Sequence, residues 1–180
     1  MSGHSKWAKL KHVKGASDAK KSKLLSMHAR WIATAVKEAG GDKNASSVKA
    51  ATERARKDNV ANDNIERAIS RGQGAGVEAF HEVFFEGFGP GGVAILVDAL
   101  TDNNNRTSQE IKHLFSKHGS SLGGPGSAAW AFTKGAIGWS ATNPVELSDD
   151  DTEKLFALVE ALEAHDDVKN VSTTVADDEE

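Results

Sequence analysis

The chain has 180 residues, of which 38% are hydrophobic and 27% charged, and it contains no cysteine. This length is sufficient for a buried core, and the absence of thiols excludes disulfides and thiolate metal sites. No apolar run is long enough to cross a membrane, and the first residues lack the apolar segment of a secretory signal. We therefore expect a soluble intracellular protein.

The overall charge of -4 hides an uneven distribution along the chain. Residues 1–78 contain 16 Lys and Arg against 8 Asp and Glu, whereas residues 79–180 contain 6 against 18. Charge divided in this way predicts that the first half binds a polyanion. Pairing of the two halves, within one chain or between subunits, is the alternative.

Residues 1–15 form a basic arm without an acidic residue. Lysines neutralise phosphates, and an exposed tryptophan can stack on an unpaired base. The residues of the arm that we predict to contact nucleic acid are Lys6, Trp7, Lys9, Lys11, His12 and Lys14. The alternative is a solvated tail whose tryptophan packs into the protein's own core.

The segment 16–76 is predicted to form a domain of three helices. The expected helices run over residues 16–39, 47–57 and 62–72. The periodicity of the first one places Leu24, Leu25 and Trp31 on its apolar face, together with Ile32 and Val36.

Lysines and arginines on these helices are the second group of candidate nucleic-acid contacts. Lys23, Arg30 and Lys37 follow one another at seven-residue intervals, which places them in one stripe along the first helix. The other candidates are Lys20, Arg54, Arg56, Arg67 and Arg71. A solvated helix face is the alternative interpretation of the stripe.

Residues 77–176 are predicted to form a ferredoxin-like α/β domain with an extra N-terminal strand, which gives an α+β protein. The expected strands are 82–88, 93–100, 128–133, 136–140 and 170–175, and the expected helices are 108–118 and 149–164. Without the first strand, the order is β-α-β-β-α-β. Thr107 with Glu110 predicts a capping box for the first of these helices, and Ser148 is expected to cap the second. Residues 177–180 are expected to be an acidic tail.

The glycine-rich turn Glu86–Gly92 connects the first two of these strands. Gly87, Gly89 and Gly92 match the spacing G-x-G-x-x-G, but a dinucleotide-binding motif must open a helix and this one opens a strand. The glycines are therefore interpreted as positions of positive φ in a strand-to-strand turn. A backbone surface for another ligand is the alternative.

The sequence shows no catalytic or metal-binding constellation. The seven histidines include no pair at the four-residue spacing of a helical metal site. Residues 102–106 superficially resemble a calcium loop, but Arg106 occupies a ligand position and Thr107 replaces the required glycine. We expect a protein that is not an enzyme and binds neither a cofactor nor a metal.

Four blocks of sequence, in order along the chain, resemble the YebC/PmpR family, whose mitochondrial relative is the translational activator of cytochrome c oxidase. The blocks are Gly3–Trp7 with Lys11-His12, Asp63–Ile69, Glu86–Ala94, and Leu100–Asn103 with Asn105–Thr107. The resemblance implies a helical N-terminal domain, ferredoxin-like α/β domains and no catalytic activity. It also marks a family-motif loop formed by Gly89, Pro90, Gly91, Gly92, Asp102, Asn103, Asn105 and Arg106.

The resemblance also implies a function in gene expression. Family members are described as DNA-binding transcriptional regulators, and others as ribosome-associated factors that relieve stalling on proline-rich stretches. We expect a cytoplasmic regulator that binds DNA or ribosomal RNA, with the acidic half as a platform for a protein partner. A protein-interaction module with charge-segregated halves is the alternative from another class. The small domain that the family inserts into its second domain is expected to be absent, because the chain passes from Ile137–Trp139 to Pro144–Leu147 without room for a domain between them.

Overall fold

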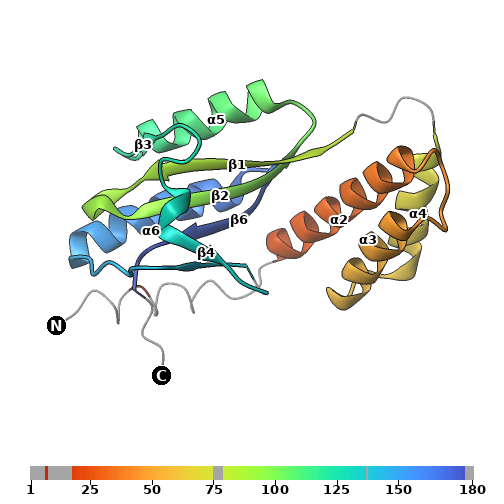
Figure 1. The fold of residues 1–180 in the computed structure, drawn as a ribbon, viewed down its shortest axis with the longest axis horizontal. Coiled ribbons are helices and arrows are strands. Elements are labelled where there is room, and N and C mark those ends of the chain that lie inside the picture. The colour runs from red at the N-terminus through yellow and green to blue at the C-terminus, as the bar shows by residue number, and fades with distance from the viewer. Residues whose placement is uncertain (1–6, 8–17, 75–78, 137, 177–180) are drawn as a thin grey trace. The chain divides into compact units, whose positions relative to one another are not determined.

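The computed structural model describes residues 7, 18–74, 79–136 and 138–176, and the chain divides into two compact units (Figure 1). The helical unit comprises Ala16–His81. The α/β unit comprises Met1–Gly15 and Glu82–Glu180, so it takes residues from both sides of the helical unit in the sequence.

Among its described residues, the helical unit contains three helices: α2 (Asp18–Glu38), α3 (Ser46–Lys57) and α4 (Asn62–Gln73). These helices confirm the three that the apolar periodicity predicts. Their shared core contains Ile32 and Val36 of α2, Val48 and Ala55 of α3, and Ile65 and Ala68 of α4. Gly40 and Gly41 follow α2 with positive φ angles of 65° and 90°, which glycine adopts without a steric penalty.

The close approach of α4 to α2 depends on Gly72. A Cβ atom at Gly72 would lie 2.6 Å from the carbonyl oxygen of Ala33 and 2.7 Å from the Cβ of Val36. The contact therefore lies in the second half of α2. The apolar cluster of this unit takes residues of α2 only from Ala29 onward.

This packing corrects one expectation about the apolar face of α2. Leu24 and Leu25, which the periodicity places on the buried face, are 42% and 38% exposed. Both lie before the part of α2 that packs against α3 and α4. The same periodicity is correct for Ile32 and Val36, which are 1% and 0% exposed.

The α/β unit contains a four-stranded sheet in the order β3-β1-β2-β6. Its strands are β1 (His81–Phe88), β2 (Ala94–Thr101), β3 (Ser121–Leu122) and β6 (Val168–Thr173), and β6 pairs antiparallel with β2. A separate two-stranded sheet is formed by β4 (Phe132–Lys134) and β5 (Trp139–Ala141). Two short 3-10 turns complete the unit, η1 (Pro90–Gly92) and η2 (Ala129–Ala131).

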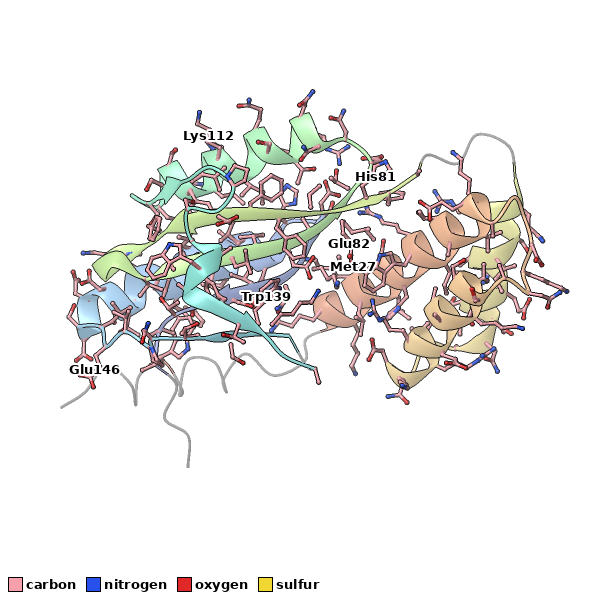
Figure 2. The ribbon with its side chains drawn as sticks, in the orientation of Figure 1. Met27, His81, Glu82, Lys112, Trp139 and Glu146 are labelled. Atoms are coloured by element: carbon pink, nitrogen blue, oxygen red, sulfur yellow. The ribbon has the colours of Figure 1, made fainter. Side chains whose placement is uncertain are left out.

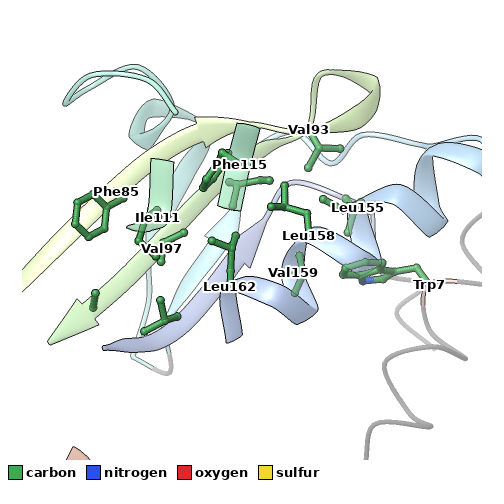
Figure 3. Packing of buried hydrophobic residues seen from close by; sticks show 14 of the residues in the cluster. Trp7, Phe85, Val93, Val97, Ile111, Phe115, Leu155, Leu158, Val159 and Leu162 are labelled. Carbon is green, nitrogen blue, oxygen red and sulfur yellow. The ribbon is translucent and has the colours of Figure 1, made fainter. Parts of the chain in front are cut away.

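Strand β2 is buried on both faces because its alternating residues face two different layers. Ile95, Val97 and Ala99 belong to the main core with α5 (Asn104–Lys117) and α6 (Asp149–Ala164), as Figure 3 shows around Val97, Ile111 and Leu162. Ala94 and Leu96 instead pack with Ala128, Ala131 and Phe132 of the segment around η2 and β4. The sheet is thus covered by two helices on one side and by this segment on the other.

The α+β class, with a helical region followed by an α/β region, is confirmed, but two details of the sheet differ from the expectation. Strand β1, expected as an addition to the ferredoxin-like order, is an interior strand between β3 and β2. The two strands expected near residues 128–140 leave the main sheet, and the first begins as a 3-10 turn. The short turn after β1 brings β1 beside β2, while β6 occupies the other edge of β2.

Of the two predicted helix caps, one is correct. The Ser148 side chain accepts a hydrogen bond from the backbone N–H of Asp151 and caps α6. The capping box at Thr107 is wrong, because α5 begins at Asn104 and its cap is Asn103, whose side chain accepts from the N–H of Arg106. Thr107 is instead buried inside the first turn.

Candidate nucleic-acid interface

The basic arm is represented in the described residues by Trp7. Lys6, Lys9, Lys11, His12 and Lys14 lie outside the described residues. Trp7 is 6% exposed and packs edge to face against Phe156 of α6, with ring centroids 6.3 Å apart (Figure 3). Its expected role in stacking on a base is therefore corrected, because the indole is buried in the core of the α/β unit.

The stripe along α2 includes residues in different environments. Lys37 is exposed, whereas Lys23 and Arg30 are half-buried. Lys20, a candidate outside the stripe on the same helix, is also exposed. The guanidinium of Arg30 lies 5.1 Å from the centroid of the Phe80 ring, and the backbone N–H of Phe80 donates to the hydroxyl of Thr34. Arg30 therefore contributes to packing within the helical unit, and a phosphate-binding role for the stripe stays a prediction.

The cations on α3 and α4 also divide by environment. Arg54 lies over the ring of Trp31 at 4.3 Å, which gives it a cation–π contact between α3 and α2. Arg56, Arg67 and Arg71 are exposed. Lys49 and Lys57 are also exposed on α3 but were not among the predicted nucleic-acid contacts; the seven-residue interval between Lys49 and Arg56 was the available signal.

The ends of α2 and α4 meet at one end of the helical unit. The side-chain amide of Gln73 donates to the carbonyl oxygen of Gly41 at 2.9 Å. The preceding residue, Gly72, lies against Ala33 and Val36 in the last part of α2. Lys37 and Arg71 occupy the last turns of the two helices and so lie at this shared end. Cations in last turns offset the negative end of the helix dipole, and lysine and arginine side chains are the groups that bind phosphates.

The glycine turn between β1 and β2 has the geometry of a strand connection. Gly92 has a positive φ angle of 77°, as predicted, and Gly91 of the same turn has one of 64°. The prediction is wrong for Gly89, whose φ angle is -105°. Gly87 serves a different purpose, because a Cβ there would lie 2.5 Å from the Phe115 ring. Strand β2 follows the turn, so a dinucleotide-binding helix is not formed here.

The other part of the family-motif loop holds the start of α5 in place. Arg106 donates to the carboxylate of Asp167 at 2.6 Å and pairs with Asp102 at 3.0 Å. The hydrogen bond to Asp167 raises the pKa of Arg106 above its ordinary value. The hydroxyl of Thr107 also donates to Asp167, whose side chain is 5% exposed. Arg106 therefore has a structural role here, fixing α5 against the residue that precedes β6.

Beside this ion pair, Glu110, His165 and Asp167 place three potential ligand atoms within 4.8 Å of one another. His165 lies 2.8 Å from Glu110, and its Nδ1 accepts from the backbone N–H of Asp167. The guanidinium of Arg106 already binds Asp167 and lies 3.9 Å from Glu110. This positive charge opposes a second cation, so the arrangement favours an ion-pair network over a metal site.

Glu86 organises the loop that contains residues 123–131, named here the Trp130 loop. Its carboxylate accepts three backbone hydrogen bonds, from Gly126 at 2.7 Å, Ala128 at 2.8 Å and Ala129 at 2.7 Å. Burial raises the pKa of Glu86, but the three donors outweigh that effect and hold the pKa below its ordinary value. The sequence analysis did not predict that Glu86 binds this loop. The available signal was the position of an acidic residue inside an otherwise apolar strand.

The two parts of the chain match two domain descriptions of one family. Residues 5–75 match the TACO1/YebC protein N-terminal domain, and residues 80–138 match the TACO1/YebC second and third domain. The chain belongs to the TACO1/YebC family. The match to its second and third domain ends before β5, close to the point where the inserted domain was expected to be absent.

Relatives in the TACO1/YebC family carry the name "probable transcriptional regulatory protein". One from Dictyoglomus turgidum is 46% identical over 97% of this chain and 71% of its own length. A second relative, from Dictyoglomus thermophilum, is 54% identical over 76% of this chain and 56% of its own length. A third, from Thermotoga maritima, is 47% identical over 88% of this chain and 61% of its own length. The chain thus spans between about half and three quarters of the length of these curated relatives.

A solved structure has the same architecture. The crystal structure of a conserved hypothetical protein from Aquifex aeolicus matches with a TM-score of 0.74 and 29% identity, over 91% of this chain and 93% of that one. Within the residues that the structure describes, no helix has the length and apolarity needed to cross a membrane.

Proposed function

We propose that this protein is a non-enzymatic regulator of gene expression that binds nucleic acid through the exposed cations of its helical unit. The observation that carries the proposal is the meeting of α2 and α4 at one end, with Lys37 and Arg71 in their last turns. The names of the TACO1/YebC relatives support a regulatory role.

The chemistry of these cations suits contacts to phosphate more than recognition of a base sequence. Lys37, Arg56 and Arg71 are exposed, and lysine and arginine side chains bind phosphate oxygens without regard to sequence. Residues 79–180 carry 18 acidic residues and repel the same polyanion. The helical unit is therefore proposed as the nucleic-acid-binding part, and the α/β unit as a platform for a protein partner.

The test is a salt titration of binding to a blunt DNA duplex by the full chain and by the triple variant Lys37→Ala, Arg56→Ala, Arg71→Ala. Each lost phosphate contact lowers the slope of log K against log salt by about 0.9, so the variant is expected to lose between about one and three such steps. Lys154→Ala is the matched control, because Lys154 is an exposed cation of α6 that pairs with Asp150.

Two results would contradict the proposal. An unchanged slope in the triple variant rules out these cations as the phosphate contacts, and failure of the full chain to bind any nucleic acid at low salt rules out the function. Ribosomal RNA is the alternative polyanion. Co-sedimentation of the protein with ribosomes, lost in moderate salt and lost in the triple variant, would favour it over DNA.

A further inference from the structure

Helix α6 carries a line of acidic side chains on one face. Residues separated by alternating intervals of four and three lie on the same side of a helix, because 3.6 residues make one turn. This spacing places four acids in line with one aromatic ring. The line, named here the α6 acidic face, consists of Asp149, Glu153, Phe156, Glu160 and Glu163. Glu146, which precedes the helix, is exposed and points outward from the unit (Figure 2).

The aromatic ring in the middle of this face holds one residue of the basic arm. Trp7 packs edge to face against Phe156, with ring centroids 6.3 Å apart, and is 6% exposed (Figure 3). Glu153 precedes Phe156 by three residues and Glu160 follows it by four, and both are exposed. The arm is therefore attached to α6 at a fixed point that lies between two carboxylates.

The residues next to Trp7 in the sequence are basic. Lys6 precedes it directly and Lys9 follows two residues later, in an arm without acidic residues. Both lysines lie outside the described residues, but consecutive Cα atoms are about 3.8 Å apart, so their Cα atoms lie within about 8 Å of that of Trp7. Glu153 and Glu160 lie about 4.5 Å and about 6 Å from Phe156 along the helix axis. Lysine side chains therefore have the length to meet both carboxylates.

We propose that the α6 acidic face binds the basic arm of the same chain and keeps its lysines away from nucleic acid. Single ion pairs at a surface contribute little, but Trp7 holds the lysines at a high local concentration beside a row of carboxylates. A polyanion must displace these carboxylates before it gains the phosphate contacts of the arm. This inference rests on the proposed function and deepens it, because it names a group of cations that the protein itself regulates.

The experiment measures the salt dependence of binding to a blunt DNA duplex in a face variant, an arm variant and their combination. The arm variant alone is expected to leave the slope of log K against log salt unchanged. The face variant should steepen the slope by one to four steps of about 0.9, and the combination should lose that gain. The face variant carries Glu153→Gln and Glu160→Gln, and the arm variant carries Lys6→Gln, Lys9→Gln, Lys11→Gln and Lys14→Gln.

Trypsin cleavage at the arm lysines gives a second readout, which needs no nucleic acid. Cleavage is expected to be faster in the face variant than in the unmodified chain, because a lysine bound to a carboxylate must leave it before it enters a protease site. Asp150→Asn with Asp166→Asn is the matched control. It removes the same charge from two exposed acids that lie outside the line, so it measures the effect of net charge alone.

Two results would overturn the inference and leave the proposed function intact. One is a shallower slope in the arm variant alone, which would show that the arm lysines already contact the DNA. The other is a face variant that matches the control in both slope and cleavage rate. Binding by the face variant alone would support the inference and contradict the proposed function, whereas binding by no form of the protein would overturn both.

Discussion

At the scale of single residues, Glu86 is a carboxylate that is buried and yet stabilised in its charged form. It is 8% exposed, and its two oxygens accept hydrogen bonds from three backbone N–H groups of the Trp130 loop. These bonds lower its pKa in the folded protein below the ordinary value of 4.5. Its contribution to stability is therefore complete above the unfolded pKa and is lost as the pH falls through the folded pKa.

Glu86→Gln is expected to lower the free energy of unfolding by about 2 kcal/mol at pH 7, because hydrogen bonds to a charged acceptor are replaced or lost. The difference from the unmodified chain should shrink as the pH falls below 4.5, the ordinary pKa, and through the lower pKa of Glu86 in the folded protein, where the carboxylate itself becomes protonated. Urea unfolding at several pH values measures both quantities. Glu66→Gln, on the exposed side of α4, is the control, and a difference that does not change with pH would refute the assignment.

At the scale of elements, the β1–β2 turn shows that neighbouring glycines are required for different reasons. Gly92 has a φ angle of 77°, and an added Cβ atom would meet nothing within 4 Å, so only its backbone conformation favours glycine. Gly87 lies in β1, where a Cβ would approach the Phe115 ring to 2.5 Å and the carbonyl oxygen of Ser121 to 2.6 Å. The spacing of a motif therefore does not show which constraint acts at each glycine.

Gly92→Ala is expected to destabilise the α/β unit by about 1 kcal/mol, the penalty for an L-residue in the left-handed region. Gly87→Ala should be more harmful, by about 3 kcal/mol, because the added methyl group displaces either a buried ring or the paired strand β3. Thermal unfolding of the two variants gives the order. Equal effects, or a larger effect at Gly92, would show that the close contact at Gly87 relaxes freely.

Elements with strong local signals could be predicted from the sequence. The periodicity of α2, α3 and α4 and the Ser148 cap are local patterns, and the structure confirms them. The helix cap was wrongly predicted at Thr107 because the sequence offers two suitable cap residues, Thr107 and Asn103, four residues apart. The choice between them depends on the burial of Thr107 against Asp167, which the sequence does not show. The separate β4–β5 sheet could not be predicted, since a short apolar run does not show which face of which sheet it will cover.

At the scale of the whole molecule, contacts distant in sequence decide the candidate sites. Trp7 packs against Phe156, Glu86 binds the amides of the Trp130 loop, and Arg106 pairs with Asp167. Each contact joins segments that no local pattern relates. The division of charge between the two halves was visible in the sequence, whereas the sequence left the burial of Trp7 as one of two alternatives, and only its contact with Phe156 decides between them.

Trp7→Ala is expected to destabilise the α/β unit by about 3 kcal/mol, because removal of a ring that is 6% exposed leaves a cavity beside α6. Hydrogen exchange followed by mass spectrometry should show faster exchange in α6 and β6, with α3 and α4 unchanged. Unaltered exchange in α6 would mean that the Trp7 contact contributes nothing to stability. Faster exchange throughout both units would show that they unfold together.

The pairing of β2 with β6 has a consequence for the time course of synthesis. Ile95 pairs with Thr173, and Trp7 needs Phe156, so the α/β unit uses both early and late parts of the chain. The helical unit can fold once residue 81 has left the ribosome exit tunnel, since its contacts are local. The α/β unit must wait for its last strand. Trp7, translated before every helix and strand named here, is among the last residues to reach its final environment.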